Sequence, residues 1–142
     1  MPERLRLCPC GPPSREVAAF VAGLGLPARW AYRLRLAADE ITTNVVQHGY
    51  RGEPGWIELT AYVDGDLAWL CVVDEASPFD PTSARCTPRT DLDSGPPGGL
   101  GLLLVRAAVR LMCYERVDGR NRTTLLIPRG GHDGAPDRIR GQ

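Results

Sequence analysis

Lysine is absent from this chain, together with several other features that mark specialised classes of protein. All 17 basic residues are arginine and they are balanced by 17 acidic residues, so the formal net charge is zero. A neutral chain creates no long-range field of one sign, which gives no support to nucleic acid or a membrane surface as a partner. We take the exclusive use of arginine as a mark of a GC-rich genome rather than of function.

Long apolar runs and paired cysteines are lacking as well. No stretch is long enough to cross a bilayer and the N-terminus has no signal-peptide core, so we expect a cytoplasmic protein without a membrane partner. The five cysteines are odd in number and include no CxxC pair, which argues against a disulfide framework and a zinc site. Cys71 and Cys113 are expected to be small core residues.

The apolar patterns predict one domain over residues 1–129 and a flexible tail over 130–142. Its first half is expected to contain a strand at 4–7, a helix from Ser14 to Ala22 with Ser14 as N-cap, and a helix from Pro27 to a left-handed cap at Gly49. Its second half is expected to contain a hairpin of strands 56–63 and 67–73, a helix at 102–112, and a hairpin of strands 113–117 and 122–127. The predicted strand 67–73 carries Leu67, Trp69, Cys71 and Val73 on one face.

The helix that includes Leu34 to Tyr50 carries the first pair of candidate functional residues. Its apolar side chains recur every three or four positions and form one stripe for a core: Trp30, Leu34, Ala37, Ile41 and Val45. Glu40 and Asn44 lie at the edge of this stripe, one turn apart, so that a carboxylate and a carboxamide point the same way. Such a pair can hold a metal ion and position a nucleophile, but it can equally be a solvated helix face.

Two later stretches add polar chemistry. Asp74 ends a predicted strand, where its carboxylate can accept a hydrogen bond from the amino group of a base or form a turn with its own backbone. Gly98-Gly99-Leu100-Gly101 opens a predicted helix, whose unpaired N–H groups can bind a phosphate, although a hinge would use the same residues. The Pro-rich segment from Pro81 to Pro97 between them has no periodicity and is typical of a lid or binding loop.

In this order the motifs resemble the ATP-binding domain shared by histidine kinases and gyrase, the GHKL ATPase fold, and within it the small bacterial anti-sigma-factor serine/threonine kinases. The match covers roughly Ser14 to Pro128. It is carried by Asp39-Glu40 through Asn44, His48-Gly49-Tyr50, Asp74, Pro78-Phe79-Asp80-Pro81 and Gly98-Gly99-Leu100-Gly101-Leu102, and more softly by Tyr114-Glu115-Arg116 and Arg122-Thr123-Thr124-Leu125. The resemblance implies an α/β (α+β) two-layer sandwich, in which a mixed, mostly antiparallel sheet has helices on one face.

The resemblance also assigns roles to single residues. Asn44 would ligate a Mg²⁺ ion that bridges the phosphates of ATP, and Glu40 would act as the base toward a serine or threonine hydroxyl of a partner. Asp74 would accept from the adenine amino group, and Thr124 would support the adenine through its hydroxyl. The remaining residues implied in nucleotide binding are Ala76, Phe79, Gly98, Gly99, Leu100, Gly101 and Leu102. His48 is expected to be structural.

The function implied is that of an ATP- and Mg²⁺-dependent serine/threonine kinase that phosphorylates a STAS-type anti-sigma-antagonist, holds a sigma factor inactive and forms a homodimer. Ala76 departs from the family, which usually has glycine there, and is expected to weaken nucleotide binding. Ala76 and the few basic residues near the site keep a second interpretation open, an ATP-binding regulatory module with little phosphoryl transfer. A third is the catalytic part of a histidine kinase, although no dimerisation helix with a phospho-accepting histidine is found.

Overall fold

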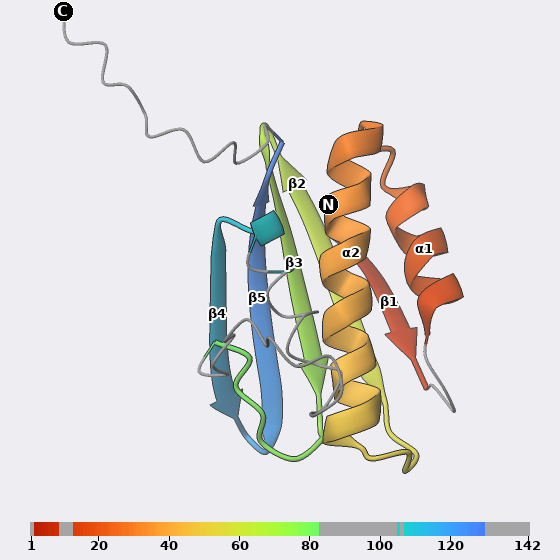
Figure 1. Cartoon of the computed structure of the whole chain (residues 1–142), viewed down its shortest axis with the longest axis vertical. Helices are drawn as coiled ribbons and strands as arrows, with labels where there is room; N and C mark the ends of the chain where they lie inside the picture. The colour runs from red at the N-terminus through yellow and green to blue at the C-terminus, as the bar shows by residue number, and fades with distance from the viewer. Residues whose placement is uncertain (1, 9–12, 83–104, 106, 130–142) are drawn as a thin grey trace, which may run out of the picture.

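Two helices lie against one face of a five-stranded sheet (Figure 1). The computed structural model describes residues 2–8, 13–82, 105 and 107–129. The elements are β1 (Glu3–Leu7), α1 (Ser14–Gly23), α2 (Ala28–Asn44), a π-helical turn η1 (Val45–Gly49), β2 (Ile57–Asp64), β3 (Leu67–Asp74), β4 (Leu111–Val117) and β5 (Arg120–Pro128). The two-layer α/β architecture expected from the sequence is confirmed. No helix in the described ranges is long and apolar enough to cross a membrane.

The order of the strands in the sheet is β1-β2-β3-β5-β4, and each of these four pairings is antiparallel. β3 and β5 therefore lie side by side at the centre, although about forty-five residues separate them in the sequence. Their register pairs Asp74 with Asn121, at the end of β3 and the start of β5. This pairing brings two polar side chains together at one end of the central strands.

The hydrophobic core lies between the helices and the sheet. Leu34 of α2 and Leu70 and Leu125 of the two central strands are completely buried. The predicted apolar stripe of α2 is confirmed from Trp30 to Ile41, whereas Val45 is only partly buried. Because the helices cover one face only, alternate residues of each strand point into the core and the others point away from it.

Both predicted helix caps are wrong. Ser14 is the first residue of α1, after Pro13, and makes no side-chain cap. α2 has no left-handed glycine at its end, because the chain passes from Asn44 directly into η1, which the Tyr50 N–H closes by donating to the carbonyl oxygen of Val45 at 2.8 Å. The helical path therefore ends at Gly49, as predicted, but through a π-turn and without a left-handed glycine.

The interpretation of the cysteines as core residues is also wrong. Cys71 is half-buried and Cys113 is exposed. Both lie on the sheet face that points away from the helices, as do Leu67, Trp69 and Val73 of β3, whereas the alternate residues Ala68, Leu70 and Val72 are buried. A strand that is apolar on both faces has no period-2 signal, so its pattern could not show which face meets the core.

The predicted hairpin of β4 and β5 is confirmed, but the helix predicted before it is too long. The N–H of Val109 still donates to the carbonyl oxygen of Val105, as in a helical turn, but the N–H of Arg110 already donates to the carbonyl oxygen of Leu126 in β5. β4 begins at Leu111, so a helix cannot continue to residue 112. The tail over 130–142 lies outside the described residues.

We expect Trp30→Phe to lower the free energy of unfolding by about 1–3 kcal/mol, since a buried carbonyl loses its donor. Trp30 is 3% exposed and its indole Nε1 donates to the carbonyl oxygen of Ile127 at 3.1 Å, which links α2 to β5. Urea unfolding followed by circular dichroism would measure the change. Trp69→Phe, on the opposite face of the sheet, is the matched control, and an equal loss in both variants would contradict the role given to this hydrogen bond.

Candidate functional site

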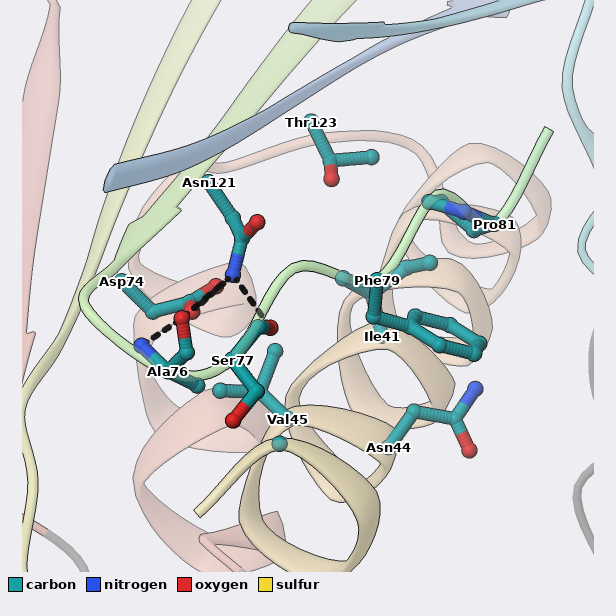
Figure 2. Close-up of a pocket in the computed structure, with 11 residues that line it drawn as sticks. Ile41, Asn44, Val45, Asp74, Ala76, Ser77, Phe79, Pro81, Asn121 and Thr123 are labelled. Carbon is teal, nitrogen blue, oxygen red and sulfur yellow. Dashed lines mark hydrogen bonds between the residues drawn. The ribbon is translucent and has the colours of Figure 1, made fainter. Parts of the chain in front are cut away.

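A pocket opens between the end of α2, the loop after β3 and the start of β5 (Figure 2). It contains side chains from segments far apart in the sequence, and Figure 2 shows Asp74 and Asn121 at one end and Asn44 at the other. The residues that line it are Ile41, Asn44, Val45, Gly49, Asp74, Ala76, Ser77, Phe79, Pro81, Asn121 and Thr123. The structure therefore brings together four of the residues predicted from the sequence: Asn44, Asp74, Ala76 and Phe79.

Asn44 is buried at the last position of α2, with 5% of its surface exposed. Its Nδ2 atom is buried without a hydrogen-bond partner among the described residues. An unpaired amide is costly in a protein interior, because its donors have lost water without gaining another partner. A carboxamide in this condition, in the wall of a pocket, fits a group that is completed by a ligand.

Glu40 lies one helical turn before Asn44 but is not among the residues that line the pocket. Partial burial raises the pKa of its carboxyl group, and the neighbouring carboxylate of Asp39 raises it further. Asp39 also has one buried carboxylate oxygen without a hydrogen-bond partner in the described chain. A carboxyl group whose pKa is raised in this way is better suited to accept a proton than an ordinary exposed glutamate.

Asp74 is almost completely buried at the end of β3, with 2% of its surface exposed. Its Oδ1 accepts a hydrogen bond from the N–H of Ala76 at 3.0 Å and another from Nδ2 of Asn121 at 2.8 Å. Burial raises the pKa of this carboxyl group, while the two hydrogen bonds and the charge of Arg116 lower it. Asp74 is therefore a carboxylate held in the wall of the pocket by neutral donors and one nearby cation.

Asn121 is a site residue that the sequence interpretation missed. Besides Asp74, its Nδ2 reaches the carbonyl oxygens of Ala76 at 3.2 Å and Ser77 at 3.1 Å. These contacts hold the loop after β3 against the start of β5. The alternation of β5 could have indicated this residue, because Asn121 and Thr123 share the inward face with the buried Leu125 and Ile127.

Thr124 is a correction of the predicted site. It lies on the sheet face that points away from the helices, where its hydroxyl is next to Sγ of Cys71 at 3.9 Å. The threonine in the pocket wall is its neighbour Thr123, which is 5% exposed. Successive residues of a strand point to opposite faces, so a shift of one position moved the predicted hydroxyl to the wrong side.

The phosphate-binding segment predicted at Gly98, Gly99, Leu100, Gly101 and Leu102 lies outside the described residues, as does the lid from residue 83 onward. The described ranges contain no group of three or more His, Cys, Asp or Glu side chains that could hold a metal ion.

A second cluster of side chains, around Trp56, holds the start of the loop that follows β3. The hydroxyl of Tyr50 donates to the carbonyl oxygen of Trp56 at 2.7 Å and accepts from the N–H of Glu75 at 2.9 Å. The indole ring of Trp56 has two guanidinium groups near it, with the Arg6 carbon 4.7 Å and the Arg120 carbon 5.2 Å from the ring centroid. Arg120 also forms an ion pair with Glu75 at 3.4 Å. These contacts connect Glu75, which follows Asp74, to Tyr50 and to Arg120 of β5.

Gly49 and Ala76 approach each other closely at the inner wall of the pocket. A Cβ atom added to Gly49 would lie 2.7 Å from Cβ of Ala76, which is closer than real Cβ contacts. Gly49 is therefore required for close approach and not for the left-handed cap that the sequence predicted. Ala76 is itself 4% exposed, so its methyl group has no open space in which to move.

We expect Gly49→Ala to lower the free energy of unfolding by about 1–3 kcal/mol through overpacking against Ala76. The double variant Gly49→Ala/Ala76→Gly removes the opposing methyl group and is expected to recover most of the loss. Chemical unfolding of the wild type, both single variants and the double variant completes the cycle. Additive losses, with no recovery in the double variant, would show that the two positions do not press on each other.

Comparison with known proteins gives related results at three levels. The profile of a family described as "Histidine kinase-like ATPase domain" matches residues 12–127. A serine/threonine-protein kinase named BtrW, from Bordetella bronchiseptica, is 38% identical over 108 residues, which are 72% of this chain and 76% of that protein.

Among solved structures, the histidine kinase domain from the Erythrobacter litoralis EL346 blue-light activated histidine kinase superposes with a TM-score of 0.54. The identity is 16%, and the match covers 82% of this chain and 61% of that one. At this identity the likeness shows a shared fold. The chain spans about three fifths of the length of this structural neighbour.

Proposed function

The chain belongs to the histidine kinase-like ATPase domain family, and we propose that it is an ATP- and Mg²⁺-dependent serine/threonine protein kinase that acts as an anti-sigma factor. Family membership implies ATP binding and a kinase-like regulatory role. The observation that carries the more specific proposal is the pocket, in which a buried carboxylate at Asp74 and an unpaired buried carboxamide at Asn44 lie at opposite ends.

ATP is proposed to bind with its adenine at Asp74 and its phosphates toward Asn44. The N6 amino group of adenine is a donor and would meet a carboxylate that accepts, in a pocket whose apolar lining includes Ile41 and Phe79. Asn44 is proposed to bind Mg²⁺ through its Oδ1, because an amide oxygen is a hard ligand. Its Nδ2, which lacks a partner in the described chain, can donate a hydrogen bond to a phosphate oxygen. When bound, Mg²⁺ would neutralise charge on the phosphates.

Glu40 is proposed as the general base. Its carboxylate would take the proton from a partner's hydroxyl as that oxygen forms a bond to the γ-phosphorus and ADP leaves with the electrons of the broken P–O bond. It lies on α2 one turn before Asn44, the residue proposed to meet the phosphates. Its raised pKa supports the proton-accepting role.

The proposed protein substrate is a small anti-sigma-antagonist of the STAS type, and the proposed target of sequestration is a sigma factor. The name of the relative BtrW, a serine/threonine-protein kinase, supports transfer to a hydroxyl. Incubation of the full chain with γ-labelled ATP and a candidate antagonist tests the proposal. A phosphoprotein stable in acid supports serine or threonine as the acceptor, whereas an acid-labile product would indicate histidine and contradict it.

Two observations favour the alternative of an ATP-binding regulatory module with little phosphoryl transfer. Glu40 is not in the wall of the pocket, and Ala76 has a methyl group where glycine is usual in the family. In that case calorimetry would detect ATP binding, but no candidate partner would be labelled. The same labelling experiment therefore separates the kinase from the binding module.

A homodimer is proposed through the sheet face that α1 and α2 leave uncovered. One row of paired residues across this face alternates in charge: Arg6, Glu58, Val73, Arg122 and Glu115. A twofold axis that runs parallel to the strands, between the two sheets and over β3, would place Arg6 opposite Glu115 of the partner subunit and Glu58 opposite Arg122 of the partner subunit. Sheets that pack face to face lie about 10 Å apart, which lets such side chains meet.

We expect Trp69→Glu to convert the dimer to a monomer. Trp69 is half-buried on β3, in an apolar row with Tyr62, Leu126 and Leu111, and would meet its own copy near the twofold axis. A carboxylate there would be desolvated opposite another of the same sign. Light scattering after gel filtration measures the mass of each variant. A wild-type chain that is monomeric at every concentration would contradict this interface.

A further inference from the structure

We propose that Asn121 is a positioning residue that makes Asp74 select adenine over guanine. The inference rests on the proposed binding of ATP with its base at Asp74, and it adds a determinant of nucleotide specificity on a different strand. Its basis is the direction of the hydrogen bonds around one amide and one carboxylate (Figure 2).

The amide of Asn121 can adopt only one orientation. Its Oδ1 accepts from the hydroxyl of Tyr114 and from NH1 of Arg116, the latter at 2.9 Å. Its Nδ2 faces three acceptors, which are Oδ1 of Asp74 and the carbonyl oxygens of Ala76 and Ser77. Arginine is always a donor and a carbonyl oxygen is always an acceptor, so a flipped amide would place like against like on both sides.

This fixed amide determines what Asp74 can offer to a base. Both hydrogen bonds to the carboxylate in the described chain end on Oδ1, one from Asn121 and one from the Ala76 N–H. Two donors aimed at the same oxygen require that Oδ1 carry no proton. Oδ2 is left to face the ligand, and in the ionised carboxylate it is an acceptor, which pairs with the N6 amino group of adenine and opposes the O6 lone pairs of guanine.

The charges near Asp74 also favour its ionised form, which accepts from adenine. The positive charge of Arg116 on β4 lowers the pKa of Asp74, and Arg116 also donates to the carbonyl oxygen of Ala76 at 3.1 Å. Tyr50 is neutral near pH 7, since burial raises the pKa of its hydroxyl, and Glu75 is paired with Arg120. The hydrogen bond from Asn121 lowers the pKa of Asp74 against the effect of burial. Loss of Asn121 therefore favours a protonated Asp74, which can donate to guanine.

The first test measures ATP and GTP affinity of the full chain by calorimetry for wild type and Asn121→Leu. Loss of a hydrogen bond to a charged group corresponds to about 10- to 100-fold, and we expect the ATP-to-GTP preference to fall by a factor in that range. Thr124→Val, on the opposite face of the same strand, is the matched control and should keep the wild-type preference. Thermal unfolding of each variant establishes that it is folded.

A second variant, Asn121→Asp, is close to isosteric and gives a pH signature that a purely structural role would not produce. The new carboxyl group would face Asp74, and two adjacent carboxylates share one proton. When that proton is bound it replaces the Nδ2–H donor, so ATP affinity should recover as the pH is lowered from 9 to 6. The wild type lacks this dyad, and its ATP affinity should not rise over the same range.

The outcomes separate the two proposals. A wild-type chain that binds no ATP would overturn the proposed function and this inference together. ATP binding with an unchanged ATP-to-GTP preference in folded Asn121→Leu, or a flat pH profile in Asn121→Asp, would overturn the role of Asn121 and leave the proposed function intact.

Discussion

Replacement of Glu40 by glutamine is expected to reduce phosphoryl transfer by a factor of about 10²–10⁴ while ATP still binds. Glutamine has the same shape but cannot take a proton from the acceptor hydroxyl. Because Glu40 does not line the pocket, its loss should leave the affinity for ATP nearly unchanged. Initial rates of label transfer and calorimetric ATP titrations on the same preparation give the two quantities.

The pH dependence of transfer provides the control for this prediction. A base must be deprotonated, so the rate should fall as the pH drops through the raised pKa of Glu40. Asp39→Asn removes a neighbouring negative charge, and this removal lowers the pKa of Glu40. The acidic limb of the pH–rate profile should therefore shift to lower pH. Transfer that continues at the wild-type rate in Glu40→Gln would exclude Glu40 as the base.

Asp74→Asn is expected to weaken ATP binding by about 100-fold or more, because a charge-assisted acceptor is lost and a donor takes its place. The new amide oxygen would still accept from the Ala76 N–H and from Asn121, as Oδ1 does now. Its NH₂ group would then face the N6 amino group of adenine, donor against donor. Calorimetry with ATP and GTP measures the loss, and GTP should lose far less.

The same substitution is expected to leave the fold intact or to raise the melting temperature at neutral pH. Burial raises the pKa of Asp74 in the folded chain, so its contribution to stability is full below the unfolded pKa and is lost as the pH rises through the folded one. Near pH 7 the buried carboxylate therefore costs stability, and a neutral amide removes that cost. A melting temperature that falls sharply, with ATP affinity lost only through unfolding, would contradict a binding role.

The fold could be predicted largely from local patterns. The hairpin of β2 and β3 has a clear Asp64-Gly65 turn, and the apolar stripe of α2 continues over several turns, so both were found within a residue or two. The errors fell where local signals conflict with tertiary packing. The outward face of β3 is as apolar as its inward face, and η1 continues the helical path without a sequence signal of its own.

Pocket residues that belong to a local sequence motif could be predicted. A pocket residue that acts through a hydrogen bond to another strand was missed. Asn44 and Asp74 were predicted from the family resemblance, and both line the pocket. Asn121 acts only through its register with Asp74, which depends on which strand pairs with β3. Thr124 was predicted in place of Thr123 for a related reason. The resemblance identified the segment Arg122-Thr123-Thr124-Leu125 but not which of its residues faces the pocket.

The stacked indole of Trp56 gives this protein a built-in optical probe. Its ring lies near Arg6 and Arg120, and through Arg120 and the hydroxyl of Tyr50 it is connected to Glu75, next to the residue proposed to contact adenine. Indole emission depends on nearby charge and solvent, so a shift of the Glu75 backbone on ligand entry would alter its intensity. In a double variant with Trp30→Phe and Trp69→Phe, Trp56 is the remaining tryptophan. Its fluorescence would then report nucleotide binding in a stopped-flow experiment without an attached dye.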